Sequence, residues 1–122
     1  MEHAPTSWAH ARRKFDEAVK SLPKQEQAES TALEGQRYCS ALFALEKEFA
    51  NLTAEERYKQ RQERTKPLLD ALLAWAGTKK AAPKSALGKA LHYLREQWPY
   101  LTRYLEYGRL EMSNNRAERG IK

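Results

Sequence analysis

Apolar residues recur along most of this sequence at intervals of three and four, which is the spacing of one face of an α-helix. No segment alternates apolar and polar residues for long, so the pattern offers no convincing strand. It therefore predicts an all-α chain of about four to five helices, packed as hairpins or as a bundle. We expect the core to contain large side chains from three of these helices, namely Phe43, Leu72, Trp75, Leu91 and Leu94.

The first two predicted helices are separated by a proline. The first spans about 7–21 and ends before Pro23, because proline has no amide hydrogen for a helical bond. The second spans about 24–50, with small residues early in its apolar stripe and larger ones later. Glu46 also falls on this stripe. We interpret the stripe as a packing face, with no residue pattern that suggests chemistry.

The third predicted helix begins at Thr53, which forms a capping-box pattern with Glu56. Segment 57–66 is densely charged with both signs interleaved, and we interpret it as a solvated surface with weak ion pairs. Pro67 either kinks this helix or restarts it. Gly77 is the expected C-terminal stop.

A loop is predicted at 78–84, and Ser85 is the expected N-cap of a fourth helix. Pro99 permits a bend or a new first turn, and the apolar face then continues to Gly108. Three tyrosines of this region carry rings that can stack on bases, although aromatic residues at helical spacing usually belong to a core or a half-buried surface. They are Tyr93, Tyr100 and Tyr107.

The final stretch, 110–122, has the pattern of a helix start, with Ser-Asn-Asn as candidate N-caps. If Asn115 is the cap, Glu118 lies at the third helical position, as in a capping box. A carboxylate held there between Arg116 and Arg119 suits a metal ligand that faces phosphate oxygens. It also suits an ordinary helix cap, and caps are far commoner than metal sites.

Three blocks of the sequence together resemble transposases of the insertion-sequence sixty-six family. The first is Ser-Trp-Ala-His-Ala-Arg-Arg-Lys-Phe at 7–15, the second comprises 87–94 and 98–110, and the third is Asn-Asn-Arg-Ala-Glu-Arg-Gly-Ile-Lys at 114–122. The blocks occur in family order and span nearly the whole chain. The resemblance implies an Asp-Asp-Glu transposase that cleaves and joins DNA, with Glu118 as the Glu of its metal-binding triad.

The same resemblance implies partners and cofactors. Carboxylates of such enzymes hold Mg²⁺ or Mn²⁺ on either side of the scissile phosphate, and guanidinium groups match phosphate geometry. The expected partner is transposon-end DNA, with self-association or binding to the rest of the transposase as further expectations. The expected DNA-contacting residues are Arg12, Arg13, Lys14, Arg116 and Arg119.

The family's two aspartates lie upstream of the Trp-Ala-His block, and this chain shows no counterpart of them. Its only aspartates, Asp16 and Asp70, lie within helical patterns and are not assigned to the triad. We therefore expect a fragment of an RNase H-like core that lacks its strands and is inactive alone, with no metal bound to Glu118.

Two regions are expected on this basis. Residues 1–109 form an insertion-like helical region, within which 21–108 are expected to be the insertion between the second Asp and the Glu. Residues 110–122 form the truncated start of the Glu helix. Because isolated short helices are marginal, residues 113–122 are expected to be frayed and Glu118 to be solvated.

His10 suggests a separate metal hypothesis, because some transposase families place a Cys or Asp three residues before such a histidine. Here that position is Ser7, which is a poor ligand, and zinc needs more ligands than this block offers. A structural role or a phosphate contact is the commoner function of such a histidine.

Composition leaves several functions open. Lys and Arg total 22 against 16 acidic residues, a net charge of +6, which favours polyanionic partners but also suits solvated helix surfaces. The chain lacks a long apolar run and an N-terminal leader, and its one cysteine, Cys39, fits a reducing cytoplasm, so a cytoplasmic protein is expected. The family resemblance implies that it is bacterial. The alternative functions are a non-enzymatic helical DNA-binding module and a protein-interaction module.

Overall fold

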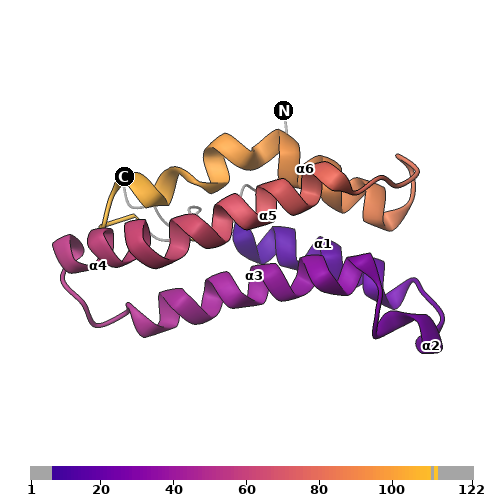
Figure 1. Ribbon diagram of the computed structural model, residues 1–122, viewed down its shortest axis with the longest axis horizontal. Coiled ribbons are helices and arrows are strands. Elements are labelled where there is room, and N and C mark those ends of the chain that lie inside the picture. The colour runs from indigo at the N-terminus through magenta and orange to yellow at the C-terminus, as the bar shows by residue number, and fades with distance from the viewer. Residues whose placement is uncertain (1–6, 111, 113–122) are drawn as a thin grey trace, which may run out of the picture.

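The computed structural model describes residues 7–110 and 112. Four long helical segments lie alongside one another, and successive segments run in opposite directions along the long axis (Figure 1). Within the described residues there is no strand, and the all-α prediction is confirmed. The four segments are α1 (Trp8–Lys20), α3 (Thr31–Glu48), the continuous run of α4 (Ala54–Gln60), η1 (Arg61–Thr65) and α5 (Lys66–Thr78), and α6 (Ala86–Leu101).

Two short elements complete the described chain. The one-turn helix α2 (Lys24–Gln27) connects α1 to α3, and the 3₁₀ helix η2 (Arg103–Glu106) follows α6. The starts of α4 and α6 follow the predicted caps: Thr53 and Glu56 form both bonds of the capping box, and the Ser85 hydroxyl accepts from the Gly88 amide.

The second predicted helix is interrupted, contrary to the prediction of one helix over 24–50. The interruption is at Ser30, whose hydroxyl accepts from the Leu33 amide and donates to the Gln27 carbonyl oxygen. One side chain therefore closes α2 and opens α3. Such a local cap competes with helix continuation, which is why serine favours helix starts over helix interiors.

The helix around Pro67 neither stops nor restarts. The amide of Lys66 bonds to the carbonyl of Arg61, five residues earlier, so the turn over η1 is a π-helix. This wider turn directly precedes Pro67, which lacks an amide hydrogen and crowds the carbonyl four residues before it. Pro99 is likewise inside α6, which continues to Leu101.

Gly77 does not end α5, which runs one residue further, to Thr78. No described glycine has a positive φ, so the left-handed cap that favours glycine is not formed here. The Arg95 guanidinium instead binds the carbonyl oxygens of Ala76 and Lys79 at the end of the helix.

The core lies between the four helical segments. Leu72, Leu91 and Leu94 are buried as predicted, whereas Trp75 and Phe43 are only partly buried at its edge. The other large buried side chains come mainly from α1, α3 and α5, and include Trp8, Phe15, Leu42 and Leu69.

Among the described residues, no helix combines the length and the apolar character that a bilayer crossing requires.

Two helical glycines should respond to alanine in opposite ways. A β-carbon at Gly35 would overlap the buried Phe15 ring, so Gly35→Ala should lower the free energy of unfolding by about 1–3 kcal/mol. Gly77 has open space at the same position, so Gly77→Ala should raise it by up to about 1 kcal/mol. Urea unfolding of both variants tests this, and equal shifts would contradict the close packing of α1 on α3.

Candidate functional site

The first sequence block packs directly on the second, although the two are far apart in the chain. The indole N–H of Trp8 donates to the carbonyl oxygen of Leu101 at 2.9 Å, across 93 positions. The amide of Ser7 donates to the Tyr93 hydroxyl oxygen at 3.2 Å. The Trp8 side chain is fully buried, and its ring meets that of Trp98 edge to face at 5.9 Å. The start of α1 is therefore fixed beside the end of α6.

His10 also contacts α6, with its ring 5.1 Å from that of Tyr93. Partial burial, followed by the nearby charges of Lys14 and Arg13, lowers the pKa of His10 and favours the neutral imidazole. In the part of the chain that the structure describes, no group of three His, Cys, Asp or Glu side chains is placed to hold a metal ion. The contacts of His10 are those of a packed aromatic residue.

The three basic residues of the first block point in different directions. The guanidinium of Arg12 lies over the Phe43 ring at 4.2 Å, and the ammonium of Lys14 lies over the Tyr93 ring at 5.5 Å. Arg13 is exposed between them. Arg12 and Lys14 therefore cover aromatic surface on opposite flanks of α1, and Arg13 is the side chain most open to a phosphate.

The predicted site residues near the C-terminus, Glu118, Arg116 and Arg119, lie outside the described residues. So does the segment 113–122, for which fraying is predicted. The last described residue, Met112, is buried with 6% exposure in the same core as Trp8.

The tyrosines considered for base stacking differ in exposure. Tyr93 is buried and is not accessible to a base. Tyr100 and Tyr107 are about half exposed, at 49% and 53%.

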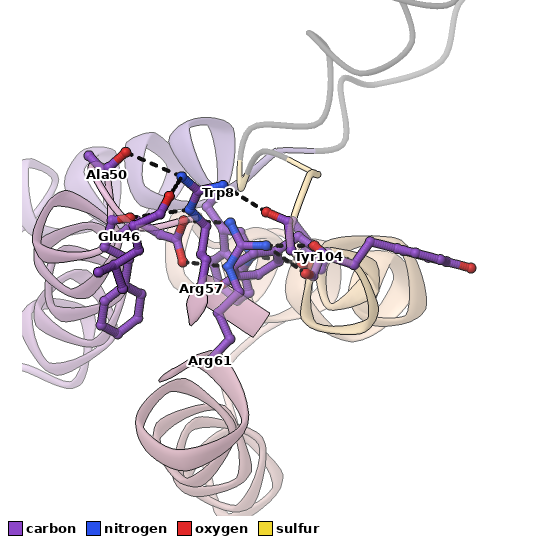
Figure 2. Close-up of polar contacts among 11 residues, drawn as sticks. Trp8, Glu46, Ala50, Arg57, Arg61 and Tyr104 are labelled. Atoms are coloured by element: carbon purple, nitrogen blue, oxygen red, sulfur yellow. Dashed lines mark hydrogen bonds and ion pairs between the residues drawn. The ribbon is translucent and has the colours of Figure 1, made fainter. Parts of the chain in front are cut away.

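Arg57 and Arg61 form a network that the sequence did not predict (Figure 2). The Arg61 side chain is 1% exposed and makes two bonds to the Glu46 carboxylate, at 2.7 and 2.9 Å. Its Nη1 donates to the carbonyl oxygens of Tyr104 and Tyr107, at 2.9 and 2.8 Å. The interpretation of 57–66 as a solvated surface is therefore wrong for Arg61.

The interpretation also fails for Arg57, which lies one helical turn earlier and is partly buried. Its Nη1 donates to the Gly108 carbonyl oxygen at 2.8 Å. The remaining donors reach carbonyls at the end of α3 and in the following turn, those of Phe49, Ala50 and Leu52. Arg57, Arg61 and Glu46, here called the arginine cluster, thus join α3, the η1 region and the C-terminal segment. The signal for it in the sequence was Glu46, a carboxylate on an apolar stripe.

Comparison with known proteins places these blocks in one family. The sequence profile described as "Transposase IS66 family" matches residues 4–122. This chain belongs to the IS66 family of transposases. The resemblance found in the three sequence blocks is thereby confirmed.

Two relatives from Sinorhizobium fredii (strain NBRC 101917 / NGR234) also match. They are the uncharacterized protein y4hP, 32% identical over 123 residues, and the uncharacterized protein y4jD, 34% identical over 116 residues. Each alignment covers 93% of this chain but only 22% of the relative. The chain thus spans about a fifth of the length of these curated relatives. No solved structure shows a significant match.

Three of the described carboxylates, those of Asp16, Asp70 and Glu46, are each paired with a basic side chain. Asp16 and Asp70 lie on the surface in ion pairs with Lys20 and Lys66, each four positions away. Glu46 is engaged by Arg61. The buried Cys39 is not a nucleophile at neutral pH, because burial raises the pKa of its thiol to about 12.

Proposed function

We infer that this chain is the part of an IS66-family transposase that supplies the glutamate of an Asp-Asp-Glu triad. In this proposal, the complete enzyme cleaves and joins transposon-end DNA by metal-dependent phosphoryl transfer. Support comes from family membership and from one structural observation: the bond from Trp8 to Leu101 fixes the beginning of the helical region beside its end.

That observation has a physical meaning for an inserted helical region. A segment inserted between two parts of a catalytic domain has to return the chain close to where it departed. Ser7 bonds to Tyr93 and Trp8 bonds to Leu101, and Met112 shares their core. This arrangement supports the proposal that the bundle is an insertion and that the residues after it, including Glu118, return to the domain from which the chain entered.

The chemistry assigned to the complete enzyme needs several carboxylates, because divalent ions stabilise both the attacking and the leaving oxygen. Glu118 supplies one ligand, and Arg116 and Arg119 neutralise phosphate charge nearby. Because Asp16 and Asp70 are engaged at the surface, the other ligands come from elsewhere in the complete enzyme.

The 122-residue chain alone is therefore expected not to cleave or join transposon-end DNA in Mg²⁺ or Mn²⁺. The complete transposase is expected to do both under the same conditions. A gel assay on end-labelled DNA compares the two. Metal-dependent cleavage by the pure chain that disappears in Glu118→Gln would contradict the proposal that other carboxylates are required.

Weak, sequence-independent DNA binding by the chain is also expected, with affinity that falls steeply as salt rises, because phosphate contacts release counterions. Arg13→Ala should weaken binding and reduce the salt slope by about 1, the effect of one lost phosphate contact. Lys20→Ala is the matched control, since Lys20 is the last residue of α1 and pairs with Asp16. Fluorescence anisotropy over a salt series measures both.

The alternative function, a protein-interaction module, predicts a different result. DNA retention that does not depend on salt, or no retention at all, would favour it. Association of the chain with itself or with the remainder of the transposase is a further proposal, and light scattering of the purified chain tests the first of these.

A further inference from the structure

Side chains from the α4–η1 region hold the segment 104–108, which leads from the end of α6 towards the last described residues. Arg61 binds the carbonyls of Tyr104 and Tyr107, and Arg57 binds that of Gly108. Gln62 adds a bond from its amide to the Leu105 carbonyl at 2.8 Å. Four of the five carbonyls in this segment are therefore held by three side chains from one stretch of helix.

Burying the ion pair of this network costs desolvation free energy, which apolar side chains in the same space would not. A guanidinium taken out of water needs full pairing, and apolar residues of similar volume often stabilise a protein as well or better. Here the Arg61 guanidinium lies over the Tyr104 ring at 4.7 Å and donates hydrogen bonds to one carboxylate and two backbone carbonyls. Unlike an apolar contact, a hydrogen bond is directional, so each bond from the arginine to a backbone carbonyl restricts the path of the segment.

Gly108 restricts that path further. A β-carbon at Gly108 would overlap the Ala54 carbonyl at the start of α4, so only glycine permits this close approach. Beyond it, Leu110 packs against the core and Met112 is buried. Glu118 is six residues after Met112. Six residues of fully extended chain span roughly 20 Å at most.

From this arrangement we propose that Arg57 and Arg61 are positioning residues for the Glu118 motif, acting by fixing the path of segment 104–108 and so the direction in which the chain continues towards Leu110 and Met112. The inference rests on the proposed function of Glu118. Neither arginine contacts DNA or metal in this role. Because a misplacement of about 1 Å at a reacting centre can cost roughly 100-fold in rate, the path of this short connection matters to the chemistry.

The structure contains a matched control. Arg64, in the same turn of helix as Arg61, pairs with Glu48 of α3 at 2.9 Å, but both side chains are about half exposed. The two pairs thus join the same elements with the same chemistry, and only that of Arg61 is buried and bonded to segment 104–108. Lysine keeps the charge at either position but lacks the planar fork that binds three acceptors together.

The test uses Arg61→Lys, Arg57→Lys and Arg64→Lys in the complete transposase. The first two should lower the rate of cleavage at saturating DNA by roughly 100-fold. They should also raise the Mg²⁺ concentration for half-maximal cleavage by about 10–100-fold, as loss of a group that orients a ligand does. The Kd for transposon-end DNA should stay unchanged, and Arg64→Lys should match the unaltered enzyme in all three measurements.

A second measurement does not depend on activity. In the 122-residue chain, amide exchange over 104–110 should become faster in Arg61→Lys, while α1 and α3 keep their protection. Gly108→Ala should act in the same way, since it displaces the segment and leaves both arginines intact.

The outcomes separate the two proposals. If the unaltered transposase does not cleave DNA, the proposed function fails and this inference falls with it. If it cleaves, and the Arg61 and Arg57 variants cleave at its rate, this inference alone is overturned. A parallel loss of cleavage, DNA affinity and protection throughout the bundle would also overturn it, because that pattern indicates general unfolding.

Discussion

Replacing Glu118 with glutamine in the complete IS66-family transposase is expected to reduce cleavage of transposon-end DNA to the background level. Glutamine has nearly the same shape as glutamate but carries no charge, so it is a poor ligand for Mg²⁺, which prefers anionic oxygen. DNA binding should be retained, because one fewer negative charge does not weaken attraction to phosphate. A cleavage assay and a binding assay on the same preparation measure the two effects.

Glu106→Gln is the control for this substitution, since it makes the same chemical change at an exposed position of η2. It should leave both cleavage and binding unaltered. A Glu118→Gln enzyme that cleaves at the normal rate would remove Glu118 from the catalytic triad and leave it as an ordinary helix cap.

Trp8→Ala is expected to cause a large loss of stability, about 3–5 kcal/mol, as is typical for deletion of a fully buried aromatic side chain. This is a large share of the 5–15 kcal/mol by which small domains are usually stable. The substitution removes the ring that packs on Trp98 and leaves the Leu101 carbonyl without its donor. Chemical unfolding of the 122-residue chain gives the change directly.

Two further variants separate packing from the hydrogen bond. Trp8→Phe keeps an aromatic ring and loses the indole N–H, so its cost should be closer to that of one unpaired carbonyl, about 1–3 kcal/mol. Trp75→Ala should cost less than Trp8→Ala, because Trp75 is only partly buried and its indole bonds to the exposed Glu34. Equal losses of unfolding free energy for Trp8→Ala and Trp75→Ala would show that the contact of α1 with α6 contributes no more to stability than the contacts of Trp75.

Local signals in the sequence predicted the helix starts well. Thr53 with Glu56 and Ser85 act through neighbouring amides, so three or four residues contain the whole interaction. Ser30 is the same kind of signal, but it lies within a continuous apolar stripe, and the stripe concealed the break. Periodicity reports which face is buried and does not require the helix to be unbroken.

Arg57 and Arg61 turn inward towards carbonyl oxygens more than 40 positions away, as well as towards nearer groups of α3 and the turn after it. A charged stretch with both signs usually lies in water, and nothing within 57–66 distinguishes these two arginines from Arg64. Only Glu46 on the apolar stripe pointed to a buried partner. Glu118 was identified by resemblance to a family motif, since spacing alone fits a helix cap as well as it fits a metal ligand.

The arginine cluster binds segment 104–108 through main-chain oxygens, and this has a consequence for protein engineering. Every residue type carries a backbone carbonyl, so substitutions of the exposed Glu106 or Tyr107 leave the acceptors in place. A library that randomises these two positions should therefore retain the path of the chain in most members. A substitution within segment 104–108 cannot replace a lost arginine, because the hydrogen-bond donors belong to the α4–η1 region.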